Sequence, residues 1–145
     1  MEKKYEVNIL EPKKSKNTKF VVTQHETEGL VKVVFNAMPI RDQMRNVERD
    51  HYDITRDLYP NAKIEEISKH KRGGIVLGGG RVIYENGEFA LSGRSTDFGY
   101  APKEDLINLG PLVLKAYHES MPEITKLHLY DERQRLFEMF DISKE

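Results

Sequence analysis

The sequence predicts an α+β domain in which a mixed β-sheet of about five to six strands is flanked by helices. Three observations lead to this prediction. Asn86-Gly87 lies between two alternating apolar runs, and this residue pair favours a two-residue hairpin turn. Runs rich in β-branched and aromatic residues precede it, over 19–25 and 30–36. Apolar residues at helical spacing then follow over 40–59.

The hairpin is the most sharply defined of these elements, with strands expected near 75–84 and 88–93. A type I′ turn at Asn86-Gly87 sets the opposed pairs Tyr84–Phe89, Ile83–Ala90, Val82–Leu91 and Arg81–Ser92. Because side chains alternate along a strand, one face carries Val82, Tyr84, Phe89 and Leu91 and is interpreted as the core face. The other face carries Arg81, Ile83, Ala90 and Ser92.

Further elements are expected on both sides of the hairpin. A short strand is expected over 3–10, and the segment 62–69 fits a strand or a helix equally well. Pro102 is expected to open a helix that Gly110-Pro111 kinks or restarts. After it come a last strand over 124–130 and a terminal helix over 131–140, which belongs to a helical extension over 131–145.

The segment 40–59 has two interpretations. Apolar residues recur every three or four positions from Ile40 to Leu58, which predicts one continuous helix ended by Pro60. Alternatively, a helix begins at Asp50 as its N-cap. That alternative places His51 beside backbone N–H groups that attract anions.

Composition excludes several classes of protein. The chain has 145 residues, of which 38% are hydrophobic and 32% charged, and this length suits one domain over 1–145. A formal net charge of −1 provides no general attraction to nucleic acid or to an anionic membrane. No run has the length of a membrane span, and there is no cysteine for a disulfide, a thiolate nucleophile or a thiolate metal site. A cytoplasmic location is the expectation.

One end of the hairpin has the composition of an anion site. Gly78-Gly79-Gly80-Arg81 enters the hairpin there, and Gly93-Arg94-Ser95 leaves it at the same end. Backbone N–H donors, forked guanidinium groups and a small hydroxyl suit an oxyanion such as phosphate. The structural alternative is that the glycines serve only a bulge or a turn.

Histidine is the residue most suited to proton transfer near neutral pH. No pair among the 5 histidines has the spacing of a zinc helix motif, so neither a metal nor a cofactor is expected. His51 lies on an apolar face in the continuous-helix interpretation, where it is a core residue, and at a helix N-terminus in the other, where it can act on an anion.

Several motifs together resemble the Janus/Ocnus family, which includes the protein histidine phosphatases. The blocks that carry the resemblance are Leu77-Gly-Gly-Gly-Arg81-Val82, Gly93-Arg94-Ser95-Thr96-Asp97-Phe98-Gly99-Tyr100-Ala101, His51-Tyr52-Asp53-Ile54 and Lys19-Phe20-Val21. The resemblance covers roughly 19–130.

The resemblance implies a protein histidine phosphatase-like fold and a metal-independent hydrolase of phosphohistidine or another phosphoramidate. It implies that Lys19 and Arg81 offset the phosphoryl charge and that Ser95 donates a hydrogen bond. Backbone N–H groups near Gly93 and Asp97 would add to this phosphate site. His51 would act as a general base or a nucleophile, and the partner would be a phosphorylated protein or a small phosphoramidate.

The chain also departs from the family pattern. The family has an arginine before the histidine, where this chain offers Lys32, Arg41, Arg45 or Arg49. Asp97 brings a carboxylate to a position where the family has a small residue. A non-catalytic phosphate-binding or phosphoprotein-binding module is therefore the alternative function, and a structural or interaction protein is the third.

Overall fold

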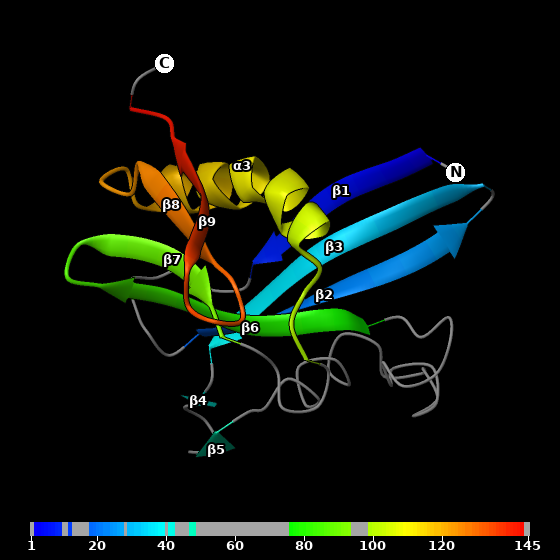
Figure 1. Ribbon diagram of the computed structural model, residues 1–145, viewed down its shortest axis with the longest axis horizontal. Helices are drawn as coiled ribbons and strands as arrows, with labels where there is room; N and C mark the ends of the chain where they lie inside the picture. The colour runs from blue at the N-terminus through cyan, green and yellow to red at the C-terminus, as the bar shows by residue number, and fades with distance from the viewer. Residues whose placement is uncertain are drawn as a thin grey trace.

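A curled β-sheet wraps around one long helix in the part of the chain that the structure describes (Figure 1). The computed structural model describes residues 2–9, 12, 18–27, 29–39, 41–42, 47–48, 76–93 and 99–143. The elements in these residues are β1 (Glu2–Ile9), β2 (Thr18–Thr27), β3 (Leu30–Pro39), β4 (Arg41–Asp42), β5 (Val47–Glu48), β6 (Val76–Glu85), β7 (Glu88–Ser92), α3 (Lys103–Ser120), β8 (Lys126–Tyr130) and β9 (Leu136–Asp141).

The main sheet has seven strands in the order β1-β3-β2-β6-β7-β8-β9, and β4 pairs separately with β5. The sheet is mixed, because β1 runs parallel to β3 and β7 parallel to β8, whereas its other neighbouring strands are antiparallel. Parallel neighbours need a crossover connection, and α3 provides it between β7 and β8. The helix therefore returns across one face of the sheet.

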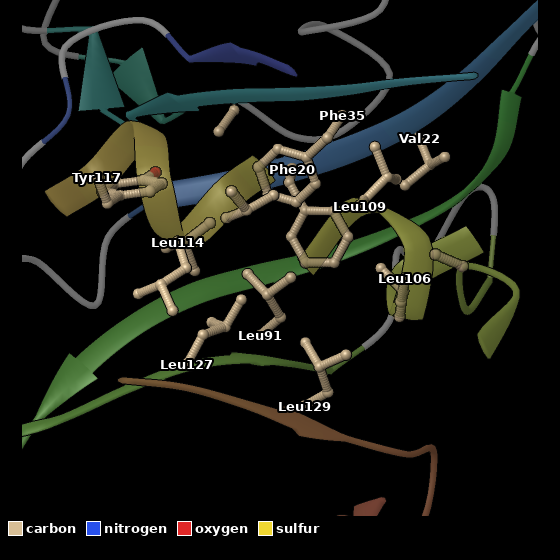
Figure 2. Packing of buried hydrophobic residues seen from close by; sticks show 14 of the residues in the cluster. Phe20, Val22, Phe35, Leu91, Leu106, Leu109, Leu114, Tyr117, Leu127 and Leu129 are labelled. Carbon is tan, nitrogen blue, oxygen red and sulfur yellow. The ribbon is translucent and has the colours of Figure 1, made fainter. Parts of the chain in front are cut away.

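The hydrophobic core lies between α3 and that face (Figure 2). Leu106, Leu109, Val113 and Tyr117 of the helix are buried, at the three- and four-residue spacing that places side chains on one side of a helix. The sheet side supplies alternate residues of its strands, as the period of two requires. These sheet residues include Phe20, Val22, Val33, Phe35, Val82, Phe89, Leu91, Leu127 and Leu129.

Both edges of the sheet reach the helix. Helix α3 contacts β1 at one edge as well as β8 and β9 at the other, so the sheet must curl around it (Figure 1). At the β1 edge, the Tyr5 hydroxyl donates a hydrogen bond of 3.1 Å to Asp105 Oδ1, and Lys3 Nζ lies 3.6 Å from the same atom. These contacts attach an edge strand to the first turn of the helix.

The predicted hairpin is confirmed in its turn and its register. Asn86 and Gly87 have φ angles of 54° and 79°, the positive values that a type I′ turn needs. The pairs Tyr84–Phe89, Ile83–Ala90, Val82–Leu91 and Arg81–Ser92 form as expected. The expected strands at 3–10, 19–25, 30–36 and 124–130 and the helix after Pro102 are also present, and α3 continues through Pro111 as one element.

The expected architecture is nevertheless wrong. The described residues form a largely β structure with seven strands in the main sheet and one helix, in place of a five- to six-stranded α+β sheet flanked by helices. This correction includes the protein histidine phosphatase-like arrangement that the resemblance implied. The physical reason is that segments with mixed apolar patterns find partners for their backbone N–H and C=O groups in neighbouring strands.

Two expected helices account for this difference. Within 40–59, Arg41–Asp42 pairs with Val47–Glu48 as antiparallel strands, so the continuous helix is wrong over that part. A helix beginning at Asp50, and the segment 62–69, lie outside the described residues. At the other end, Leu136–Asp141 is strand β9, paired with β8, where the terminal helix was expected. Asp131 and Gln134 form a turn that returns the chain alongside β8.

Candidate functional site

A row of polar side chains crosses three strands on the face opposite α3. Lys19 of β2 lies directly opposite Arg81 of β6, and Arg81 lies directly opposite Ser92 of β7. Directly opposed residues share one face of a sheet, with Cβ atoms about 4.5–5.5 Å apart. The sheet thus places Lys19 and Arg81 side by side, as the anion-site hypothesis required. We call these three residues the Lys19–Arg81–Ser92 row.

Two like charges face each other in this row. Arg81 is exposed and Lys19 half-buried, and neither forms an ion pair with any described residue. Like charges directly opposite each other destabilise a sheet, so an anion between them would stabilise the pair. A phosphoryl group has the charge and the acceptor oxygens for both an ammonium and a guanidinium group.

The glycines beside this row serve the chain's own packing. A Cβ on Gly78 would lie 2.3 Å from the Tyr100 carbonyl oxygen, and one on Gly80 would lie 2.6 Å from that of Ser92. Gly79 N–H donates a hydrogen bond of 3.0 Å to Gly99 O. Glycine is required here because another backbone segment approaches closely, which is neither the anion site nor the bulge or turn that the sequence suggested. The hypothesis of an anion site therefore rests on the side chains of Lys19 and Arg81.

Both described ends of the connection from β7 to α3 lie beside strand β6. Gly93 follows Ser92, with a φ angle of 78° that favours glycine, and Gly99 and Tyr100 lie beside Gly79. Ser95 and Asp97 of the predicted site belong to this connection and lie outside the described residues. His51, the predicted catalytic residue, also lies outside the described residues. The structure thus brings Lys19, Arg81 and Gly93 together and leaves the other three undescribed.

The described strands exclude one of the four residues that could take the place of the arginine in the Janus/Ocnus pattern. Lys32 lies on the same face as Lys19, but Lys19 is opposite Met38 of β3, six residues further along the strand. At about 3.3 Å per residue, Lys32 is roughly 20 Å from the row. Its ammonium group lies 3.5 Å from Glu6 Oε2, so it already has an anionic partner. Lys32 is therefore too far away to complete the row. Arg41 is described only as part of strand β4, and Arg45 and Arg49 lie outside the described residues.

Three histidines lie in the described part of the chain. Nδ1 of His118 and of His128 lies 2.8 Å and 3.3 Å from the carbonyl oxygens of Ile124 and Phe89 respectively, so each Nδ1–H donates to the backbone. Burial lowers the pKa of His25, and the charge of Lys32 lowers it further. His128 lies opposite Ala90, on the face that carries Arg81. Its Nε2 is the nitrogen left unprotonated in the neutral ring.

Two hollows flank the end of the hairpin. One, of about 310 Å³, lies along β6 and β7 and is lined by Ile83, Glu85 and Glu88, among others. Its carboxylates disfavour an anion, whereas the Lys19 side of the row is cationic. The other, of about 200 Å³, lies on the face that α3 covers and is lined largely by apolar side chains.

The apolar hollow is a feature that the sequence did not indicate. The turn between β8 and β9 forms one wall of the hollow. The sequence pattern predicted a helix over 131–140 and therefore missed this turn. Asp131 in the turn is buried, and its Oδ1 accepts hydrogen bonds of 2.9 Å from the backbone N–H groups of Arg133 and Arg135. The bond from Arg135 contributes most to lowering the pKa of Asp131. Asp131 thus acts as a turn residue.

No group of three or more histidine, aspartate or glutamate side chains that could hold a metal ion occurs among the described residues. Within the same residues, no helix is long and apolar enough to cross a membrane. Comparisons of the chain with protein-family models, with curated proteins and with solved structures found no match. The resemblance to the Janus/Ocnus family therefore rests on its short motifs alone.

Proposed function

We propose that this protein binds the phosphoryl group of a phosphorylated protein or a small phosphoramidate at Lys19 and Arg81. The observation that carries the proposal is the direct opposition of these two cations across β2 and β6, without an anionic partner among the described residues. A phosphoryl group would accept hydrogen bonds from both. Gly93, which follows Ser92, lies at the same end of the hairpin.

The enzymatic form of the proposal is a metal-independent phosphohistidine phosphatase. Lys19 and Arg81 would then offset the charge on the phosphoryl oxygens, and His51 would act on water as a base or on phosphorus as a nucleophile. Protonation of the leaving imidazole labilises the P–N bond. This form depends on His51, Ser95 and Asp97, whereas binding depends on the two described cations.

Binding is tested by NMR titration with inorganic phosphate and with phosphoramidate. Hydrogen bonds to charged groups are worth about 1.5–3 kcal/mol, so Arg81→Ala should weaken phosphate binding at least tenfold. Arg81→Lys should restore only part of it, because lysine lacks the guanidinium fork. Lys19→Ala should weaken binding in the same direction.

Lys32→Ala is the matched control for Lys19→Ala. It removes the same charge from the same face of the sheet, roughly 20 Å from the row by the strand rise. Phosphate affinity should survive this change. An equal loss in both variants would mean that phosphate responds only to net charge, and the proposed site would then be abandoned.

Hydrolysis is tested separately by phosphate release from phosphohistidine, with and without EDTA. Positioned general bases typically contribute about 10²–10⁴-fold, so His51→Ala should lower turnover by that factor and leave phosphate binding intact. His118→Ala is the control, because His118 is held by the Ile124 carbonyl. Phosphate binding without release would support a non-catalytic module, and an active His51→Ala variant would require another catalytic residue.

A further inference from the structure

The apolar hollow beneath the first turn of α3 is a cavity of about 200 Å³. It opens between this turn, the ends of β6 and β7, and the turn that connects β8 to β9. Phe20 and Leu91 contribute its sheet wall, Leu106 its helix wall and Phe137 its β9 wall. Figure 2 shows Phe20, Leu91 and Leu106 pointing into the same region between helix and sheet.

Aromatic side chains make up much of the lining. Phe20, Tyr100, Tyr130 and Phe137 all contribute, from β2, the connection before α3, β8 and β9. The tyrosine hydroxyls already have acceptors, since Tyr100 donates to Glu132 O, in the wall of the same cavity, and Tyr130 donates to Glu88 Oε1. The rings thus offer their apolar surfaces. Aromatic pairs in offset or edge-to-face geometry gain about 0.5–1.5 kcal/mol beyond the burial of area.

Two of the charged residues that line the cavity, Lys103 and Asp131, are already paired with each other. Lys103 Nζ lies 3.7 Å from Asp131 Oδ2 and 5.1 Å from the centre of the Phe137 ring. Asp131 Oδ2 also accepts a hydrogen bond of 3.2 Å from Arg135 Nε. A charged ligand would have to compete with these contacts as it lost its own hydration, whereas a neutral ligand leaves them intact.

We propose that this cavity binds a small neutral aromatic molecule of one or two fused rings. An apolar protein cavity of about 150 Å³ holds benzene, so the present volume accommodates a ring with a substituent or a second fused ring. The cavity lies on the face of the sheet opposite Lys19 and Arg81, and it shares Ser92 and Gly93 with the end of the hairpin where the phosphoryl group is proposed to bind.

The test is an NMR titration with indole as the probe and benzoate as the charged comparator. Indole should shift the amide signals of Gly79, Gly93 and Leu106 saturably, and benzoate should bind at least several-fold more weakly. Phe137→Leu should lower the indole affinity several-fold. Phe140→Leu is the matched control, because it makes the same change on the same strand away from the lining, and indole affinity should persist.

Ala101→Leu is a second variant, which should abolish indole binding by filling the cavity, since Ala101 lines it and is buried. Thermal unfolding of each variant establishes that it is folded. Absence of a saturable indole shift in the wild type, or equal loss in Phe137→Leu and Phe140→Leu, would overturn the proposal. Benzoate binding as tight as that of indole would overturn the neutral class of ligand.

Discussion

Asp131 combines two structural contacts in one carboxylate. It accepts backbone hydrogen bonds that close the turn before β9, and it pairs with Lys103 at the start of α3. Because these contacts favour the ionised form, its pKa in the folded state lies below the ordinary aspartate value of 3.8. The group therefore stabilises the fold above its unfolded pKa, and this contribution is lost as the pH falls through the folded pKa.

Asp131→Asn should therefore lower the free energy of unfolding most at neutral pH. The difference from the wild type should begin to shrink below about pH 3.8, where the carboxyl group of the unfolded chain becomes protonated, and should vanish once the pH falls through the lower pKa of the folded state. Urea unfolding at pH 7 and at pH 3 measures this change. Glu132→Gln is the control, because its side chain is exposed in the same turn. An Asp131→Asn effect that does not vary with pH would contradict this account.

Helix α3 and strand β9 pack closely against each other at Gly110. A Cβ on Gly110 would lie 2.2 Å from Phe140 Cε2, so the phenyl ring occupies the space that a side chain would need. Glycine in a helix interior costs about 1 kcal/mol relative to alanine, and Pro111 beside it removes a helical N–H. Contact with β9 therefore outweighs helix propensity here.

Gly110→Ala should destabilise the protein by about 1–3 kcal/mol despite the better helix propensity of alanine, because overpacking a core has that cost. The double variant Gly110→Ala with Phe140→Leu should recover part of this loss, since leucine vacates the ring positions. A double-mutant cycle from urea unfolding measures the coupling between the two sites. Additive effects would show that the two residues do not conflict.

At the scale of the whole molecule, the sheet is closed around α3 by contacts at its two edge strands. The β1 edge depends on the hydrogen bond between Tyr5 and the buried carboxylate of Asp105. Burial and this acidic partner raise the pKa of Tyr5 to about 12. A raised pKa means that Tyr5 stabilises the fold below its unfolded value of 10.0, and that the contribution is lost as the pH rises toward 12.

Tyr5→Phe should thus lower the free energy of unfolding at pH 7 by about 1.5 kcal/mol, within the range for a hydrogen bond to a charged group. Hydrogen exchange should show faster opening of β1, while the β6–β7 hairpin keeps its protection. Tyr84→Phe is the matched control on another strand. Equal loosening of all seven strands would indicate that β1 is not a separate attachment.

The sequence predicted individual elements better than it predicted how they pair in the sheet. The hairpin register was predictable because Asn86 and Gly87 accept positive φ angles, which is a local property. From that register alone, Arg81 and Ser92 were expected to face each other. The Lys19–Arg81–Ser92 row could not be predicted from the hairpin alone, because it also depends on the pairing of β2 with β6 that places Lys19 opposite Arg81.

Strand pairing between distant segments was decided only by the tertiary structure. Leu136, Phe137 and Phe140 fit a helical or an extended pattern, and partnership with β8 selects the strand. Likewise the sequence suggested that Gly78, Gly79 and Gly80 serve an anion site or a bulge or turn. In the structure they accommodate the backbone of Gly99, Tyr100 and Ser92. The sequence by itself thus determined the turn, the hairpin and the cationic residues. The order of strands, the turn at Asp131 and the aromatic cavity depend on contacts between distant residues, which no local pattern encodes.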